Sequence, residues 1–151
     1  KDNGSSEIDN NKENLDLNKL IPLISVAPSN QEIKSLVESW LAGKADILNG
    51  SESQFLSSVA RPSLFKRVIE QRKKDKLLGQ KQIIDANITS INIVQRSDKR
   101  IAAEVELNYK DKMINSSGDI LSETVIPSLK VKYIIGKNKK NWLLVDYISG
   151  N

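Results

Sequence analysis

Asp146 is the residue that the sequence places best for acid–base chemistry. It is the one polar member of the run Trp142–Ile148, which predicts a β-strand. A carboxyl group among apolar side chains loses hydration, and its pKa can then rise into the range of a general acid. With regular alternation Asp146 shares a strand face with Trp142, and Tyr133 or Tyr109 could supply a second polar group. The opposing interpretation, a partly solvated Asp near a strand end, stays open because nothing in the spacing brings either tyrosine to Asp146.

Glu104 and Glu106 are the other pair that resembles a catalytic arrangement. They are two positions apart on an expected strand, which separates them by roughly 7 Å. They alternate with an apolar face formed by Ala103 and Val105, so we interpret them as a solvated pair. The chain has no His and no Cys, which excludes Ser-His-Asp and Cys-His nucleophiles and thiolate metal sites. We expect no catalytic, cofactor-binding or metal-ligating residues.

The C-terminal stretch Leu129–Ile148 predicts an antiparallel hairpin around a Lys/Asn turn. Its first strand alternates cleanly. Its second strand is apolar on both faces, since Leu143, Val145 and Tyr147 lie opposite Trp142. Such a strand needs cover on both sides or a partner on one, which leaves self-association open.

Helices precede the strands. Ser29-Asn30-Gln31-Glu32 is a capping box, and the helix it opens carries an apolar stripe that ends at Asn49-Gly50. The members of the stripe are Ile33, Leu36, Val37, Trp40, Leu41, Ala45 and Leu48. Ser51-Glu52-Ser53-Gln54 repeats the capping pattern before a short helix, and Pro62 begins a third helix that stops near Leu78-Gly79.

From Ile83 the apolar period changes to two. A strand over 84–94, a turn at Ser97-Asp98-Lys99 and a second strand through Tyr109 precede a polar loop over 113–123 and the final hairpin. This order predicts an α+β fold, with N-terminal helices packed on a four-stranded antiparallel sheet in a cone-shaped, NTF2-like arrangement. We expect residues 1–28 to be a flexible linker, within which the apolar segment 20–27 could dock in an extended form, and residues 29–151 to be a single domain.

Composition bounds the remaining possibilities. With 151 residues, of which 38% are hydrophobic, the chain suits one core. Its formal charge is +4, although residues 1–28 hold three lysines against five acidic residues, so the folded part is the basic part. The apolar segment 20–27 is too short to span a bilayer. We expect a fragment of a longer, membrane-anchored protein.

The ordered features resemble one family over roughly residues 31–148. They are Trp40 and Lys44 on the capped helix, Phe55-Leu56 and Val59 before Pro62-Ser63-Leu64-Phe65, Ser90-Ile91-Asn92-Ile93 before Ala102-Ala103-Glu104-Val105-Glu106, and Val131-Lys132-Tyr133 before Trp142. Together they are similar to the C-terminal, intermembrane-space (IMS) domain of ZipN-type cyanobacterial and plastid division proteins. The resemblance implies a non-catalytic interaction domain of a division scaffold, on the periplasmic side of the inner membrane and across it from the FtsZ ring.

The resemblance also implies a docking site for the tail of a division partner, built from an aromatic on the third helix and apolar residues in the following turn. Here the aromatic position is Val68, and the turn residues are Leu77 and Leu78. The predicted partner-binding residues are Leu64, Val68, Arg72, Lys73, Leu77 and Leu78, with the two cations pairing to acidic groups or a terminal carboxylate. The alternative is that the apolar members are core contacts, as we also interpret Trp40 and Trp142.

A basic cluster covers the third helix and its exit. It comprises Lys66, Arg67, Arg72, Lys73, Lys74, Lys76 and Lys81. It could meet an anionic membrane surface or an acidic partner, or it could be a solvated face. Because no aromatic residues are interleaved for base stacking, we do not expect nucleic-acid binding.

Overall fold

The computed structural model describes residues 23–24, 27–51 and 55–150. The elements are β1 (Leu23–Ile24), α2 (Asn30–Leu48), α3 (Leu56–Val59), α4 (Pro62–Leu77), β2 (Gln80–Arg96), β3 (Arg100–Asn115), β4 (Ile120–Asn138) and β5 (Asn141–Ser149). The predicted α+β order, helices first and a strand meander after them, is confirmed. One capping pattern, Ser51-Glu52-Ser53-Gln54, lies largely outside the described residues.

The strands form one antiparallel sheet in the order β1-β5-β4-β3-β2. Its four long strands are the predicted ones. The two-residue β1 adds a fifth strand by pairing Leu23 with Trp142 and Ile24 with Asn141, so this part of the apolar segment 20–27 does dock in an extended form. The linker prediction for 1–28 otherwise falls mainly outside the described residues, and the NTF2-like comparison stays a prediction.

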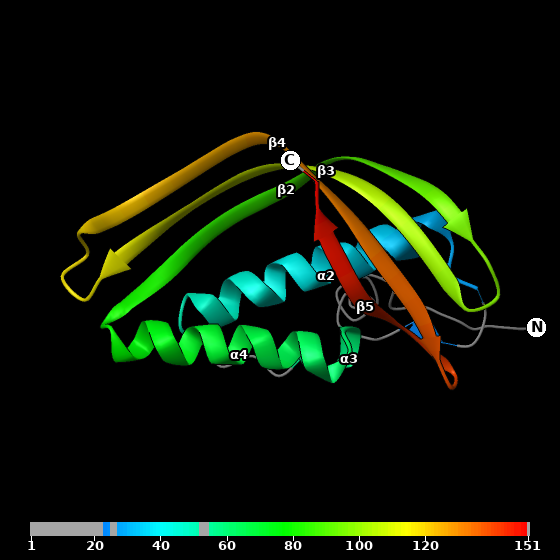
Figure 1. Cartoon of the computed structure of the whole chain (residues 1–151), viewed down its shortest axis with the longest axis horizontal. Coiled ribbons are helices and arrows are strands. Elements are labelled where there is room, and N and C mark those ends of the chain that lie inside the picture. The colour runs from blue at the N-terminus through cyan, green and yellow to red at the C-terminus, as the bar shows by residue number, and fades with distance from the viewer. Residues whose placement is uncertain (1–22, 25–26, 52–54, 151) are drawn as a thin grey trace, which may run out of the picture.

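The sheet arches over the helices, which all lie on its concave side (Figure 1). Two register shifts bend the β2–β3 ladder, and another accompanies Pro127 in the β3–β4 ladder. A proline cannot donate to a ladder and is tolerated where pairing is interrupted. The irregularities increase local twist and bending, and the curvature they give lets one sheet enclose the helices.

Helix α2 begins at the predicted capping box. The Ser29 side chain accepts a hydrogen bond from the Glu32 amide at 3.1 Å, and the Glu32 carboxylate accepts one from the Ser29 amide at 2.8 Å. The apolar stripe of α2 enters the core, where Trp40 is 1% exposed. Trp142, on β5, is equally buried, so packing accounts for both tryptophans.

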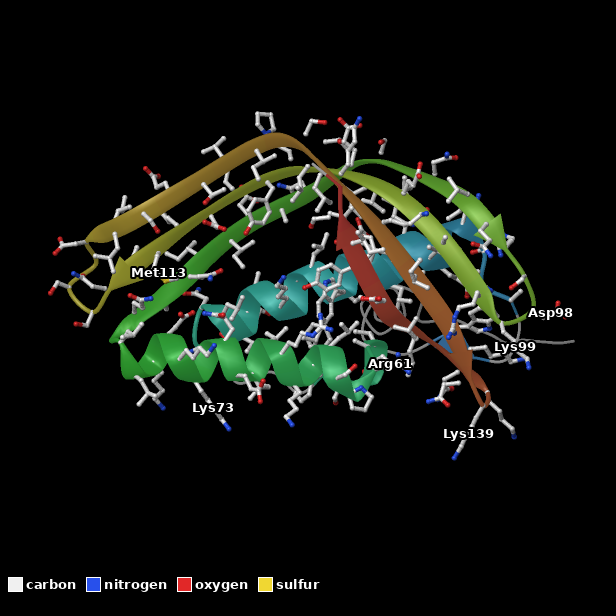
Figure 2. The ribbon with its side chains drawn as sticks, viewed as in Figure 1. Arg61, Lys73, Asp98, Lys99, Met113 and Lys139 are labelled. Carbon is white, nitrogen blue, oxygen red and sulfur yellow. The ribbon has the colours of Figure 1, made fainter. Side chains whose placement is uncertain are left out.

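Strand β5 is joined to the helical layer by its backbone. The Arg61 amide, at the start of α4, donates a hydrogen bond to the Leu144 carbonyl at 2.9 Å. Ala60 forms an isolated parallel β-bridge with Leu144. Figure 2 shows Arg61 at this end of α4. The junction of α3 and α4 is thereby fixed against the sheet.

A β-bulge in β5 corrects our assignment of its two faces. The register passes from Ile134↔Asp146 to Ile135↔Leu144, so Val145 is the extra residue and the alternation reverses there. Trp142 and Leu144 point inward before the bulge, and Tyr147 packs against the core after it. The bulge thus removes Tyr147 from the outer face, where Leu143 and Val145 are half-buried and Ile148 is 57% exposed. Self-association stays a prediction.

The predicted polar loop over 113–123 is wrong. Strand β3 continues to Asn115 and β4 begins at Ile120, with Met113 paired to Ser122 across the ladder. The Asn115 side chain accepts from the amides of Ser117 and Asp119 at 3.0 and 2.9 Å and closes the turn. The hairpin projects beyond the core, so its strands need no apolar face. For this reason the sequence of 113–123 shows no alternation of apolar and polar residues.

The capping box gives a test of the fold. Ser29→Ala removes the acceptor for the Glu32 amide and should lower the free energy of unfolding by about 1 kcal/mol, measured by urea denaturation. Ser63→Ala is the control, because Ser63 is exposed in the first turn of α4 and the N-cap there is Arg61. Equal losses in both variants would contradict the role given to Ser29.

Candidate partner-docking surface

The structure separates the predicted apolar docking residues into two groups. Leu64 and Val68 are 1% and 4% exposed and belong to the core. Leu77 and Leu78 are 88% and 71% exposed. Leu64 and Val68 therefore pack α4 against the core. Of the four predicted apolar docking residues, only Leu77 and Leu78 present apolar surface to solvent.

The two predicted cations also differ. Arg72 is half-buried and its guanidinium donates to the Gln80 carbonyl at 3.0 Å, which holds the first residue of β2 against α4. Lys73 is exposed and points away from the sheet (Figure 2). Arg72 lines a hollow near Gly79, whereas Lys73 is not among the lining residues of that hollow.

A hollow of about 420 Å³ lies where α4 ends. It brings the helix exit together with the turn between β3 and β4, and its lining residues are Arg72, Lys76, Gly79, Gln80, Lys81, Ile114, Asn115, Ser116 and Gly118. We call this hollow together with Leu77 and Leu78 the α4-end surface. Its β3–β4 members were missed because that segment was expected to be a polar loop.

The chemistry of the α4-end surface is apolar and cationic. Arg72, Lys76 and Lys81 are the charged residues that line the hollow, and they can hold a carboxylate through charge-assisted hydrogen bonds. The positive φ of Gly79, 69°, lets the chain turn directly from α4 into β2. The surface therefore combines a hollow lined by cationic residues with two exposed leucines.

The remaining basic cluster faces solvent. Lys66, Arg67, Lys73 and Lys74 are exposed along α4. Arg67 lines a different hollow of about 290 Å³ between the helices and the sheet, together with Lys44, whose Nζ lies 5.4 Å from the Tyr147 ring. The cluster is thus divided between the helix surface, the α4-end surface and this inner hollow.

Asp75 lies buried beneath the same end of α4. It is 2% exposed, and its Oδ1 accepts from the Gln71 side chain at 3.0 Å. Its Oδ2 has no hydrogen-bond partner among the protein groups of the described residues. A buried carboxylate in the last turn of a helix is unfavourable both for its desolvation and for the helix dipole.

The prediction that Asp146 faces a cavity on the Trp142 side is wrong. The bulge at Val145 turns Asp146 to the outer face, where it is exposed and its Oδ1 accepts from the Tyr147 amide at 2.8 Å. Tyr133 points to the inner side, where its ring centroid lies 6.1 Å from that of Tyr147. The groups proposed for acid–base chemistry therefore lie on opposite faces of the sheet.

Both candidate tyrosines are held in their neutral form. The pKa of Tyr109 is raised mainly by burial, and further by its hydrogen bond to Asp111 and by the negative charge of that residue. The Tyr109 hydroxyl donates this hydrogen bond to the Asp111 carboxylate. Burial, then Tyr147, raises the pKa of Tyr133. Glu104 is exposed as expected, whereas Glu106 is half-buried and accepts from the Ser128 hydroxyl.

The fold and this surface define a class: small α+β domains in which helices fill the concave side of an antiparallel sheet and one end of the helical layer stays open. Within that class, the chain belongs to the family described as ARC6-like, IMS domain, whose model matches residues 33–145. The resemblance to the IMS domain of ZipN-type division proteins is confirmed.

One solved structure shares the fold of this chain. The crystal structure of the intermembrane space region of chloroplast protein ARC6 is similar with a TM-score of 0.64 at 13% identity, covering 82% of this chain and 98% of that one. A structure from Catenulispora acidiphila has a TM-score of 0.49 at 11% identity, covering 80% and 91% of the two chains. No curated protein sequence matches. Among the described residues, no helix has the length and hydropathy to cross a membrane.

Asp75 supplies a test of the energetics at the α4-end surface. Asp75→Asn keeps an acceptor for Gln71 and removes the buried charge, so it should raise the free energy of unfolding by about 1 to 2 kcal/mol in urea denaturation at pH 7. Asp98→Asn, in the exposed β2–β3 turn, should change it by less than about 0.5 kcal/mol. A loss of stability in the Asp75 variant would show that its carboxylate is paired.

Tyr133 supplies a test by pH. The pKa of Tyr133 is higher in the folded than in the unfolded state. Its contribution to the free energy of unfolding is therefore complete below pH about 10. This contribution is lost as the pH rises above that value, because only the unfolded state then releases the proton. Tyr133→Phe should therefore lose less stability than the wild type between pH 9 and pH 11.5. Parallel pH curves in urea denaturation would contradict a raised pKa.

Proposed function

We propose that this chain is a non-catalytic interaction domain of a membrane-anchored division scaffold, and that it captures a partner protein at the α4-end surface. Family membership supports a division-related role. The observation that carries the docking proposal is the exposure of Leu77 and Leu78, at 88% and 71%, beside a cationic hollow.

The partner segment we propose carries an apolar residue and a carboxylate. The apolar side chain would cover the two leucines, and an acidic side chain or C-terminal carboxylate would pair with Arg72 and Lys76. Lys73, which does not line the hollow, would contribute attraction without direct pairing. Because Val68 is buried where the family places an aromatic contact, binding energy here would come from the helix exit.

We place the domain on the periplasmic side of the inner membrane, joined to an anchor through residues 1–28. A similar solved structure is described as the intermembrane space region of chloroplast protein ARC6, which supports an extracytoplasmic position. The exposed lysines Lys66, Lys73 and Lys74 would then face a membrane surface or the partner, and attraction to anionic lipid would be about 1 kcal/mol for each one that reaches it.

Substitution of Leu78 tests the docking proposal. Leu78→Asp should abolish co-purification of division proteins with the membrane-anchored parent from its own cells, because it puts a charge into the apolar contact. The fold should remain cooperative in thermal unfolding, since Leu78 is largely exposed. Leu78→Ser provides a second variant that adds no charge to the helix end near Asp75.

Val94→Asp is the matched control. Val94 is 44% exposed on β2, so the substitution adds the same charge at an exposed apolar position outside the α4-end surface. Recovery of the same division proteins with the wild type and both Leu78 variants would contradict docking at this surface.

A further inference from the structure

A second hollow, of about 510 Å³, separates helix α2 from strand β2. Its floor and one side are formed by five consecutive residues of β2, from Ile84 to Ile88. Successive side chains of a strand point to opposite faces, so a hollow lined by an unbroken run of strand residues opens onto the strand's edge and its backbone.

That edge lies at the end of the sheet. Strand β2 is the outermost strand and pairs with β3 alone. Among the backbone hydrogen bonds of the described residues, none joins 84–88 to anything outside the β2–β3 ladder. An edge strand of 17 residues offers a row of donors and acceptors to another chain.

The opposite wall is apolar and held in place by helix packing. Leu41, Ala42 and Ala45 of α2 form it together with Phe55. Phe55 closes on α2 because Gly43 has no side chain: a Cβ at Gly43 would lie 3.0 Å from the Phe55 Cζ and 2.9 Å from the Leu56 Cδ1. The inward side chains of a strand laid along β2 would pack on this wall.

The charge of the hollow is opposite to that of the domain. Glu38 and Asp85 are the two charged residues that line it, and both are acidic, in a chain whose formal charge is +4. The Asn87 side chain donates to Asp85 at 2.8 Å and orients that carboxylate at the rim. The hollow therefore favours a segment that carries a lysine or arginine.

We propose that the groove between α2 and β2 binds an extended segment of a partner protein as an added strand on β2, with inward apolar side chains on the α2 wall and an outward basic side chain opposite Asp85 at the rim of the hollow. This site is separate from the α4-end surface and does not depend on the partner proposed there. The groove would recognise a partner segment in which apolar and polar residues alternate around one lysine or arginine.

A single strand suits the groove better than a second copy of the chain. The α2 wall and the β2 edge line the same hollow, so an added sheet would have to bring its own helical layer against α2. Pairing of two β2 strands would also place the acidic residues of both copies at one junction, where like charges repel.

The test uses two capped eight-residue peptides of alternating valine and threonine, one with a central lysine and one with a central glutamate. The lysine peptide should bind the 151-residue chain about tenfold more tightly, by fluorescence anisotropy. Hydrogen exchange should show new protection of backbone amides within 84–88. Glu38→Lys combined with Asp85→Lys should reverse the preference between the peptides.

Ala42→Trp should abolish binding by filling the groove, and Ser63→Trp, at an exposed helix position outside it, should leave binding unchanged. Binding without protection of 84–88, or equal binding by both tryptophan variants, would overturn the proposal. No binding of either peptide would overturn it as well. If hydrogen-exchange protection of 84–88 rises with protein concentration in the absence of peptide, the β2 edge pairs with a second copy of the chain instead.

Discussion

The packing of α2 into the concave face of the sheet is the interaction on which the rest of the structure depends. Trp40 brings the helix against β5, where its ring centroid lies 5.8 Å from that of Tyr147. Tyr147 in turn contacts Tyr133 of β4. Such aromatic contacts add to the area they bury. The bulge at Val145 makes this arrangement possible, because without it Tyr147 would point outward.

The curvature that encloses α2 also decides which surfaces remain open. The sheet covers the middle of the helical layer (Figure 1). It leaves the end of α4 exposed, with Leu77 and Leu78 in solvent, and it leaves β2 as an unpaired edge beside α2. The two surfaces differ in charge: the first is cationic and the second acidic. The two proposed sites therefore share no lining residue.

Much of the fold followed from local sequence signals, and the exceptions have a common cause. The capping box at Ser29, Pro62 at the start of α4 and the turn at Ser97 are short-range features that the sequence displays directly. The bulge at Val145 depends on which residues of two strands pair, and a run that is apolar throughout does not reveal a shift of register. The missed hairpin beyond Met113 has no buried face to impose alternation.

The candidate site shows the same limit. The sequence correctly placed Leu77 and Leu78 at a helix exit, but the 3.6-residue period alone could not separate exposed Leu78 from buried Leu64 and Val68, because all are apolar residues on or next to α4. The arrangement of Arg72 and the β3–β4 turn around one hollow depends on the whole fold and cannot be seen in the local sequence.

Site-specific photocrosslinking in living cells tests the central claim most directly. A photoreactive amino acid at position 78 of the membrane-anchored parent should give a discrete adduct with one division protein, while the same amino acid at position 94 should give none. Adducts of equal intensity at the two positions, or an adduct at 94 alone, would contradict partner capture at the end of α4.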